Sequence, residues 1–525
     1  MPAYTTTHDE ELGGAASLPA GQQIFLEGAA DSDSVSGSSG EDLKGNHKNH
    51  QEATAKKTKP FIVLVAAIAA FGGLIFGYDI AGAGATFLMP GFQEHFHWCQ
   101  ENCTTAELHQ INRDEGLING LFGAGATLGA ILSPWIADTY GRRVCMFLAA
   151  LIFTVGAALQ AGAPTMGVLQ AARVIAGFAI GSLSMCSPVY TVELVPEHVR
   201  GMLSTLWQLA ITFGILVASA ANLGLQKWSE GWRISYGGNI LFSLFLMGAL
   251  VFMPESPRWL VGHGRIEEAR EAMAKTRYPE EVEAEMEELD LECKAEQERG
   301  VASWSEVLHV ENKMRYRLLL GIGLQTTQQM CGINAIMFYA PTILHNFFGS
   351  NQAIIGTFVL NFINFISTFI TIYVVDKAGR AMLLVIGGII MMCALIANSI
   401  LSAATQSDTV GYLVVLFAAI FIVGFAASWG PVVWTVCAEF YPLRERGKAT
   451  GLTTMTNWFW TTIIGAVFPL ASTASLTGCF AFFAGTICLG SLMVYFLMAE
   501  TARKTILEID EAYANHKPKL VRKKW

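Results

Sequence analysis

Long runs of apolar residues, separated by short polar segments, repeat along most of the chain. Each run is about 20 residues long, which is the length that an α-helix needs to cross the hydrocarbon core of a bilayer. The pattern therefore predicts twelve membrane-spanning helices, near residues 61–82, 116–137, 144–162, 167–190, 203–224, 233–253, 317–345, 353–375, 382–404, 411–437, 450–470 and 478–499.

The polar segments divide the chain into five parts. We predict a disordered tail at residues 1–59, a six-helix bundle at 60–253, a linker at 254–316, a second six-helix bundle at 317–499 and a tail at 500–525. The linker is rich in charged residues and good helix formers, so we interpret it as short amphipathic helices lying under the membrane. A solvated charged linker is the alternative.

The composition is also typical of a membrane protein. The chain is 52% hydrophobic and 15% charged, whereas soluble domains carry about 25% charged residues. The net charge of -9 comes largely from the N-terminal tail and the linker. Because no metal-ligand spacing, phosphate-binding loop or nucleophile–base arrangement is present, we expect no enzyme activity, no cofactor, no metal and no nucleic-acid partner. The pattern does not indicate an oligomeric state.

The charges of the short loops indicate the orientation. Lys56, Lys57 and Lys59 precede the first span, and most other basic loop residues follow even-numbered spans. Loops on the opposite side carry little beyond Arg113 and Lys227. By the positive-inside rule, both termini are expected in the cytosol.

The loop after the first span contains the Asn102-Cys103-Thr104 sequon. Because this loop is predicted to lie outside, we expect Asn102 to be glycosylated. We also expect a disulfide bond from Cys99 or Cys103, with Cys479 near the outer end of the last span as the candidate partner.

Two charged residues stand alone inside apolar runs. Asp79 is the one charge in the first run, and Arg173 is the one charge between residues 169 and 187. Charges at such depth are costly and usually functional, so we hypothesise a proton-sensitive Asp79–Arg173 pair. A purely structural role of Asp79 in packing or helix capping is the alternative.

Two motifs occur twice, at equivalent spans of the two halves. An Asp-x-x-Gly-Arg loop begins at Asp138 and again at Asp376, and a Glu-x-x-Pro-x-x-x-Arg loop begins at Glu193 and again at Glu439. The two repeats are separated by similar distances along the chain, so they indicate a duplicated six-span unit.

The repeated motifs place carboxylates and arginines at predicted cytosolic span ends. We expect ion pairs there that join the two halves and break when a central cavity opens inward. The alternative is that the positive charges only anchor the topology. The candidate gating residues are Asp138, Arg142, Glu193, Arg200, Asp376, Arg380, Glu439 and Arg446.

These motifs resemble those of the sugar porter family of the major facilitator superfamily. The resemblance also rests on the segment Pro254 to Leu260, on Gln328-Gln329-Met-Cys-Gly332-Ile333-Asn334, and on Glu500-Thr501, where Ala499 replaces a proline of the family. It implies an all-α membrane protein with the major facilitator fold, in which twelve transmembrane helices form two six-helix bundles joined by a cytosolic helical linker.

The resemblance also implies a monosaccharide site between the bundles. Amide side chains donate and accept hydrogen bonds without carrying charge, and an aromatic plane suits the C–H face of a sugar. For a single amide, an interhelical hydrogen bond would be the simpler explanation. The matching positions are Gln208, Gln328, Gln329, Asn334, Asn364 (with Asn361 as a less certain alternative), Trp434 and Asn457. We further expect Phe338, Tyr339 and Pro341 to break the seventh span.

In the proton-coupled members that this chain resembles, an aspartate of the first span is the proton site and an arginine of the fourth is its partner. Asp79 and Arg173 match these positions, although the residues after Asp79 depart from the commonest pattern. The resemblance implies import of a hexose such as glucose by proton symport across the plasma membrane. A facilitative uniporter and a non-transporting sugar sensor are the alternatives.

Overall fold

The computed structural model describes residues 59–99, 103–196, 199, 203, 205–300, 304–308, 314–404, 407–502, 504 and 506–515. The described residues belong to one compact unit. Predictions for the N-terminal tail, for glycosylation of Asn102 and for gating by Arg200 concern residues outside these ranges.

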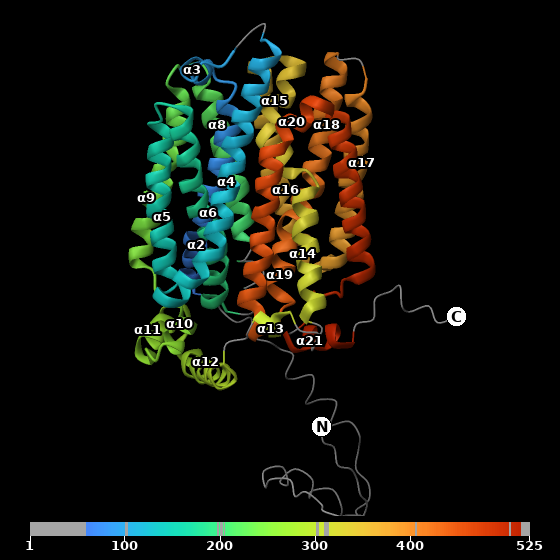
Figure 1. The fold of residues 1–525 in the computed structure, drawn as a ribbon. Helices are drawn as coiled ribbons and strands as arrows, with labels where there is room; N and C mark the ends of the chain where they lie inside the picture. Colours follow the sequence, from blue (N-terminus) through green and yellow to red (C-terminus); the bar gives the residue numbers. More distant parts are fainter. Residues whose placement is uncertain are drawn as a thin grey trace, which may run out of the picture. The chain divides into compact units, whose positions relative to one another are not determined.

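Six long helices of the first half gather on one side of the unit (Figure 1). The helices α4 and α5 both pack against α6, while α2 packs against α8 and α9. The short helix α3 (Pro90–His95) follows α2 at one end. The long helices are α2 (Pro60–Thr86), α4 (Thr105–Tyr140), α5 (Arg142–Ala161), α6 (Met166–Leu194), α8 (Leu206–Leu225) and α9 (Gly231–Phe252).

The helices of the second half lie on the other side (Figure 1). One of its spans is continuous from α18 through the π-helical turn η2 to α19, and α20 is interrupted by extended backbone at Ser475. The helices are α14 (Met314–Met330), α15 (Ile333–Phe348), α16 (Ser350–Ala378), α17 (Arg380–Ser402), α18 (Asp408–Gly424), η2 (Phe425–Trp429), α19 (Gly430–Glu439) and α20 (Leu443–Leu497).

The described helices account for the twelve predicted spans. Ten helical segments, one of which joins α18, η2 and α19, are each long and apolar enough to cross a membrane. One of these, α20, contains two of the predicted spans on either side of Ser475. The helices α14 and α15 together form one further span. The prediction of an all-α membrane protein with twelve spans is therefore confirmed.

The break in the seventh span lies earlier than predicted. Helix α14 ends at Met330 and α15 begins at Ile333, whereas Pro341 lies within α15. Gly332 adopts a left-handed conformation with φ +89°, which glycine reaches without the steric penalty of a side chain. The expectation that Phe338, Tyr339 and Pro341 break this span is thus wrong, because the glycine provides the turn.

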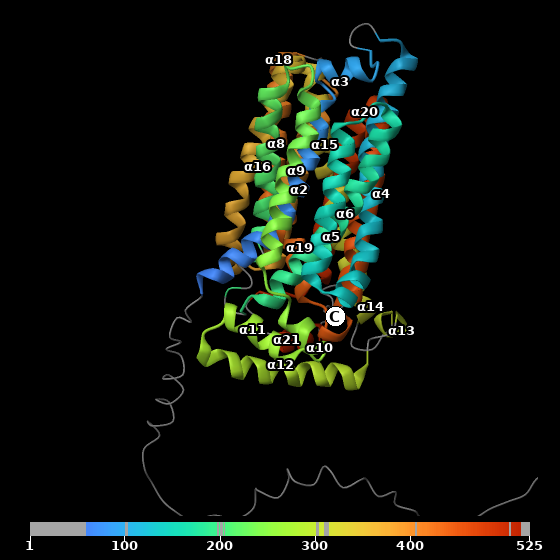
Figure 2. The same cartoon turned by 90° about the vertical axis from the view of Figure 1, so that its left-hand side faces the viewer.

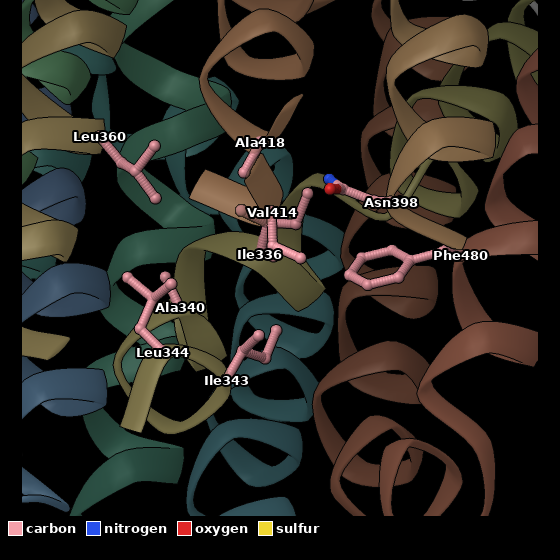
Figure 3. A pocket seen from close by; sticks show the side chains of 9 residues that line it. All are labelled: Ile336, Ala340, Ile343, Leu344, Leu360, Asn398, Val414, Ala418 and Phe480. Carbon is pink, nitrogen blue, oxygen red and sulfur yellow. The ribbon is translucent and has the colours of Figure 1, made fainter. Parts of the chain in front are cut away.

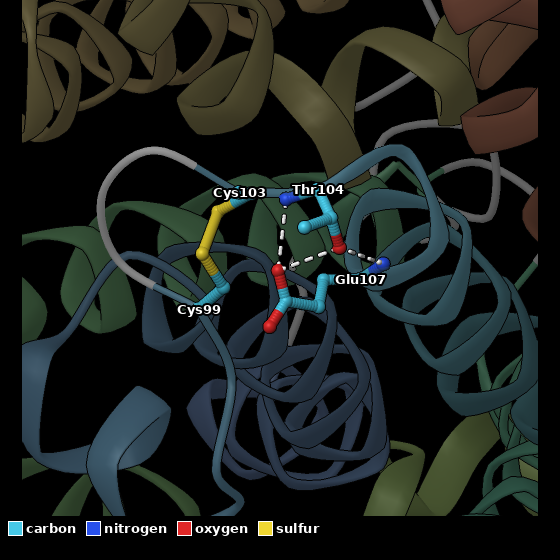
Figure 4. Close-up of a disulfide and its surroundings, with 4 residues drawn as sticks. All are labelled: Cys99, Cys103, Thr104 and Glu107. Carbon is cyan, nitrogen blue, oxygen red and sulfur yellow. Dashed lines mark hydrogen bonds between the residues drawn. A yellow bond between two sulfur atoms is a disulfide. The ribbon is translucent and has the colours of Figure 1, made fainter.

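The start of α4 also differs from the prediction. The helix begins at Thr105 rather than near residue 116, so Arg113 lies within a helix and not in a loop. A capping box stabilises this earlier start, since the Thr104 hydroxyl accepts a hydrogen bond from the Glu107 amide and the Glu107 carboxylate accepts one from the Thr104 amide (Figure 4).

The disulfide bond of the loop before α4 joins Cys99 to Cys103 (Figure 4). The candidate pairing with Cys479 is wrong, because Cys479 is a free thiol in α20, whereas Cys99 and Cys103 are bonded to each other with their Cα atoms 5.6 Å apart. We call this end of the unit the disulfide end.

The helices of the linker and α21 cover the opposite end, which we call the linker end (Figure 2). The linker helices α10, α11 and α12 pack together through an apolar cluster that includes Trp259, Met273 and Met286. The prediction that the linker is helical is confirmed, although α12 has 21 residues and is not short, while the domain boundaries at residues 253 and 316 stay predictions. The helices at this end are α10 (Pro257–Gly262), α11 (Ile266–Thr276), α12 (Pro279–Arg299), α13 (Trp304–Val307) and α21 (Ile506–Asn515).

Candidate functional site

A cavity between the two halves is lined by polar amides and aromatic rings. The first half contributes residues of α2, α6 and α8, and the second half contributes residues of α14, α15, α16, η2, α19 and α20. All seven predicted sugar-contacting residues line this one cavity: Gln208, Gln328, Gln329, Asn334, Asn364, Trp434 and Asn457. We call it the amide cavity.

Asn457 is the centre of a hydrogen-bonded amide network. Its Nδ2 donates to Gln325 Oε1 at 2.6 Å and to Gln328 Oε1 at 2.7 Å, and its Oδ1 accepts from Gln329 Nε2 at 2.7 Å. Asn334 Nδ2 extends the network by donating to Gln329 Oε1 at 2.5 Å. The amides therefore hold each other in place and also form the interhelical hydrogen bonds expected for polar residues in apolar helices.

Gln328 and Gln325 extend this network beyond the cavity wall. Gln328 Nε2 donates to the main-chain oxygens of Trp429 and Gly430 at 2.8 and 2.9 Å. These oxygens lie where η2 meets α19, so the glutamine joins α14 to an irregular part of the tenth span. Gln325 does not line the cavity but is fully buried behind Asn457, and its Nε2 has no partner among the described residues.

The two candidate asparagines of α16 have different surroundings. Asn364 lines the amide cavity, and its closest polar contact is a weak one, from Nδ2 to Met337 Sδ at 3.7 Å. Asn361 instead donates to Ser219 Oγ of α8 at 2.6 Å and joins the two halves. The geometry thus distinguishes a side chain available to a ligand from one that is already paired.

Aromatic rings form the less polar part of the same cavity. Trp434 is half-buried, and Trp458 contacts the ring of Phe76 with centroids 5.1 Å apart. Trp458 Nε1 donates to Ser184 Oγ at 3.0 Å, which fixes this indole between α20 and α6. Sequence reasoning missed Trp458 and Phe76 as lining residues, although Trp458 directly follows the predicted Asn457.

Asp79 and Arg173 form a direct ion pair in the interior of the first half. Arg173 Nη1 donates to Asp79 Oδ2 and, at 3.4 Å, to Gln160 Oε1, while its Nε donates to the Ile118 main-chain oxygen at 3.3 Å. Both charged side chains are buried, and Arg173 is completely inaccessible. Gln160 was not predicted, because a glutamine within an apolar span gives no hint of its partner.

A layer of aromatic rings separates this pair from the amide cavity. The Arg173 guanidinium lies 4.2 Å from the centroid of the Phe122 ring, and Phe122 contacts Trp458 with centroids 6.2 Å apart. On α2, Phe76 and Ile80 face the cavity while Asp79 turns toward Arg173. Helices α2 and α6 therefore contribute residues both to the ion pair and to the cavity, and one layer of side chains lies between the two sites.

The ion pairs of the repeated motifs lie within each half. Arg142 pairs with Asp138 at 3.0 Å and with Glu193 at 3.1 Å, and Arg380 pairs with Glu439 at 3.1 Å. In this structure each of these described arginines reaches a carboxylate of its own bundle, and the expectation that such pairs join the two halves and break when the cavity opens inward stays a prediction. The Arg446 guanidinium donates to the Tyr441 main-chain oxygen, and the Asp376 side chain is outside the described residues.

Two glutamates that follow the last span of each half add a third repeat. Glu255 accepts hydrogen bonds from the amides of Arg142 and Arg143 at the start of α5. In the second half, Glu500 accepts from the amides of Arg380 and Ala381 at the start of α17. Each carboxylate thereby satisfies backbone donors that a helix start leaves free.

The glycine of each Asp-x-x-Gly-Arg loop makes room for this carboxylate. Gly141 and Gly379 have φ of +101° and +84°, and a Cβ at either position would lie within 3 Å of the Glu255 or Glu500 carboxylate. Burial raises the pKa of the Glu255 carboxyl, and the hydrogen bonds from Ser256, Arg143 and Arg142 oppose this rise. Thr501 also donates to Glu439 at 2.8 Å, so both residues of the Glu500-Thr501 remnant belong to this network.

Several hydrogen bonds join the halves toward the disulfide end. The Tyr339 hydroxyl of α15 accepts from Asn119 Nδ2 of α4 at 2.9 Å and donates to the Gly465 main-chain oxygen of α20 at 2.7 Å. Asn112 Nδ2 donates to Thr473 Oγ1 at 2.9 Å between the same two long helices. These bonds hold α4 of the first half against α15 and α20 of the second.

Comparison with known proteins identifies the family. The model of the family described as "Sugar (and other) transporter" matches residues 65–513. The chain belongs to this family. It is therefore a multi-pass membrane transporter for sugars with the fold of the major facilitator superfamily.

Individual relatives agree with this assignment. Hexose transporter 2 of Kluyveromyces lactis is 32% identical to this chain, over 90% of this chain and 87% of its own length. Sugar transport protein 7 of Arabidopsis thaliana is 34% identical, over 90% of this chain and 94% of its own length. Among solved structures, the proton:xylose symporter XylE bound to 6-bromo-6-deoxy-D-glucose aligns with a TM-score of 0.74 at 25% identity, over 86% of this chain and 99% of its own. The partially occluded inward-open form of XylE from E. coli aligns with a TM-score of 0.70.

Proposed function

We propose that this sugar transporter imports a hexose such as glucose by proton symport through alternating access. The observation that carries the proposal is the buried Asp79–Arg173 pair, one layer of side chains away from the amide cavity. The names of the similar hexose transporter of K. lactis and of the proton:xylose symporter support the cargo and the coupling.

In this proposal the transported proton binds to the Asp79 carboxylate of the ion pair. An ionised carboxylate without a partner is costly at this depth, so Asp79 is stable either paired with Arg173 or protonated. Protonation removes the charge that holds Arg173 and frees α2 and α6 to shift relative to each other. Because α2 also presents Phe76 and Ile80 to the cavity, this shift changes the sugar site.

Sugar binding is expected to rearrange the amide network and thereby to move part of the second half. A hexose hydroxyl donates and accepts like the amides that it replaces, so the sugar takes over bonds that Gln329, Asn334 and Asn457 now make with each other. Since Asn334 belongs to α15 and Gln329 to α14, binding is expected to move α15 about Gly332.

The membrane potential supplies enough free energy for accumulation. Moving one charge through 100 mV yields about 2.3 kcal/mol. At about 1.4 kcal/mol per tenfold change, this supports roughly fifty-fold accumulation of sugar before any pH gradient is added.

The proposal includes an orientation. The disulfide end faces the outside at the plasma membrane, where disulfide bonds persist, and both termini lie in the cytosol. The charged pairs of Arg142 and Arg380 then brace each bundle at its cytosolic end.

A facilitative uniporter is the second candidate. The surroundings of the ion pair favour a uniporter in one respect. Arg173 also donates hydrogen bonds to Gln160 and to the Ile118 main-chain oxygen, and these bonds favour a permanent structural role of the pair. In that case sugar would equilibrate across the membrane and Asp79 would stabilise the first bundle only.

Uptake of radiolabelled glucose in a transporter-null cell distinguishes the candidates. Symport predicts accumulation above the external concentration, greater at acidic than at neutral external pH and abolished by a protonophore. Asp79→Asn should abolish accumulation while still allowing exchange of sugar across the membrane. Uptake that equilibrates and ignores the protonophore would establish the uniporter. Glu94→Gln, at an exposed position of α3, provides a matched control for loss of one carboxylate.

A further inference from the structure

A buried glutamate of α4 has no part in the site described above. Glu115 is only 4% exposed. Its main-chain oxygen lies 3.5 Å from the Tyr339 hydroxyl, but no hydrogen bond or ion pair joins its carboxyl group to another described residue. An ionised carboxylate without a partner is costly to bury, whereas a protonated carboxyl group is neutral and costs far less. This side chain is therefore stable here in its protonated form.

The position of Glu115 on α4 places it between the two halves. Asn112 precedes it by three residues and Asn119 follows it by four, so the three side chains lie along one side of the helix. Asn112 bonds Thr473 of α20, and Asn119 bonds Tyr339 of α15. Glu115 is therefore enclosed at the disulfide end, where α4 of the first half meets the second half.

Helix α15, on the other side of this contact, packs within the second half. Its residues Ile336, Ala340 and Leu344 line a small cavity together with residues of α16, α17 and α18 (Figure 3). The contact of Tyr339 with α4 is therefore a contact between the halves. Because this contact helps to bury Glu115, the glutamate loses its cover when the halves separate at the disulfide end.

The cations described near Glu115 are already engaged. On α4 itself, Arg113 is largely exposed and pairs with Asp114 at 3.6 Å. Arg173 of α6 is paired with Asp79 of α2. Neither arginine forms an ion pair with Glu115 that would stabilise its ionised form.

The remaining elements around Glu115 provide no partner either. Helix α15 contributes the Tyr339 hydroxyl, which is a phenol and neutral at physiological pH. Residues 462–476 of α20 contain no titratable residue, and His95 of α3 bonds the Ala163 main-chain oxygen of the first half. A proton is therefore the ligand that neutralises Glu115.

Opening of the disulfide end changes the protonation of this group. In water a glutamate ionises above about pH 4, so Glu115 releases its proton when the halves separate there. Closing the same end has to take the proton up again. By linkage, the ratio of closed to open molecules should then rise by up to about tenfold for each unit by which the pH falls toward that value.

We propose that Glu115 is a proton-binding site that couples closure of the disulfide end to the external pH. Its proton comes from the outside when this end closes and returns to the outside when it opens again. The proton is thus not cargo, unlike the proton that Asp79 carries in the proposed function. The inference rests on alternating access but does not depend on proton symport.

Distances between spin labels on the two halves test the proposal. Gln110→Cys of α4 and Ala474→Cys of α20 place the labels at exposed positions of the disulfide end. The accessible free thiols Cys393, Cys479 and Cys488 are replaced by serine, so that only these two labels are read. Double electron–electron resonance of the full-length protein in lipid nanodiscs should show a closed population that grows from neutral to acidic pH.

Three variants assign this pH dependence to one carboxyl group. Glu115→Gln keeps a neutral side chain of the same size, so its distances should favour the closed population at every pH. Glu94→Gln, at an exposed position of α3, is the matched control and should keep the pH dependence. Asp79→Asn should keep it as well, even though it abolishes accumulation of sugar if the protein is a symporter.

Populations that do not change with pH in the labelled parent protein would overturn the proposal. A pH dependence that persists in Glu115→Gln, or that disappears in Asp79→Asn, would do the same. Glu115→Asp provides a test if the glutamine variant does not fold. Its shorter side chain is expected to shift the pH at which the two populations are equal, and an unchanged midpoint would contradict the role of Glu115.

Discussion

At the scale of single residues, burial alone does not reveal which amide side chains are available to bind the sugar. Asn361 and Asn364 are both almost fully buried on α16, one turn of helix apart. Asn361 is paired with Ser219 across the two halves, whereas Asn364 faces the amide cavity with only a weak contact to Met337. The two side chains therefore form a matched pair for testing the site.

Replacing these two asparagines should affect different kinetic parameters. Asn364→Ala removes a hydrogen bond to the sugar, and a lost bond of about 1–3 kcal/mol corresponds to roughly a 5- to 150-fold rise in KM for glucose. Asn361→Ala should leave KM close to the wild-type value, because its amide bonds Ser219. Counterflow of radiolabelled glucose in vesicles measures both values. Equal KM values for the two variants would remove Asn364 from the sugar site.

The Asp79–Arg173 pair predicts a non-additive effect on stability. Arg173→Ala leaves a buried carboxylate unpaired and should lower the free energy of unfolding by about 3–5 kcal/mol. Combining it with Asp79→Asn should recover a substantial part of this loss, because no unpaired charge then remains. Thermal unfolding in detergent ranks the variants, with Arg315→Ala as a control because that side chain is exposed. Strict additivity would show that the pair is not energetically coupled.

At the scale of elements, carboxylate caps fix how one helix follows another at the linker end. The chain turns sharply from α4 into α5 and from α16 into α17, each time at a glycine with positive φ. Glu255 and Glu500 return from the end of each half to accept the first amides of α5 and α17. In each half, the same device thereby holds the segment after the last span against the start of the third span.

Gly379→Ala should destabilise the second half. The φ and ψ angles of Gly379 are reached essentially by glycine alone, so they cost an alanine about 1–3 kcal/mol, and the new Cβ would also displace the Glu500 carboxylate, 2.6 Å away. We expect a loss of about 1–3 kcal/mol in the free energy of unfolding, seen as earlier thermal unfolding in detergent. Gly248→Ala is the control, since its Cβ meets no atom within 4 Å. Similar melting of both variants would contradict the role of the cap.

At the scale of the whole molecule, the structure represents a state in which hydrogen bonds close the disulfide end. The bonds of Tyr339 and the Asn112–Thr473 bond join α4 to helices of the other half. Alternating access requires these contacts to break once in every cycle. At the linker end, the described ion pairs of the repeated motifs lie within one half.

A reversible cross-link at this end should therefore stop transport. Asn112 Nδ2 and Thr473 Oγ1 are 2.9 Å apart, so Asn112→Cys combined with Thr473→Cys should be joined by a short bifunctional methanethiosulfonate cross-linker. We expect the cross-link to abolish glucose uptake and a reductant to restore it. The single variant Asn112→Cys, treated in the same way, should keep its uptake. Normal uptake by the cross-linked protein would show that the disulfide end need not open.

The sequence by itself determined the number of spans, the duplication and the chemical types of the residues in the site. Helix length in a bilayer is fixed by the thickness of the hydrocarbon core, and hydrophobicity along the chain reports it directly. The amides, Asp79 and Arg173 were also recognisable, because polar groups are rare and costly in apolar helices.

Only the tertiary structure decided which of these groups meet. It placed the seven predicted residues around one cavity, distinguished Asn364 from Asn361 and paired Cys99 with Cys103 rather than with Cys479. It also showed that the described ion pairs of Arg142 and Arg380 lie within their own half. It also revealed the Glu255 and Glu500 caps, which bond residues more than one hundred positions away. Such contacts depend on how helices pack and rotate against each other, and the order of hydrophobic and polar residues along one helix does not specify its neighbours.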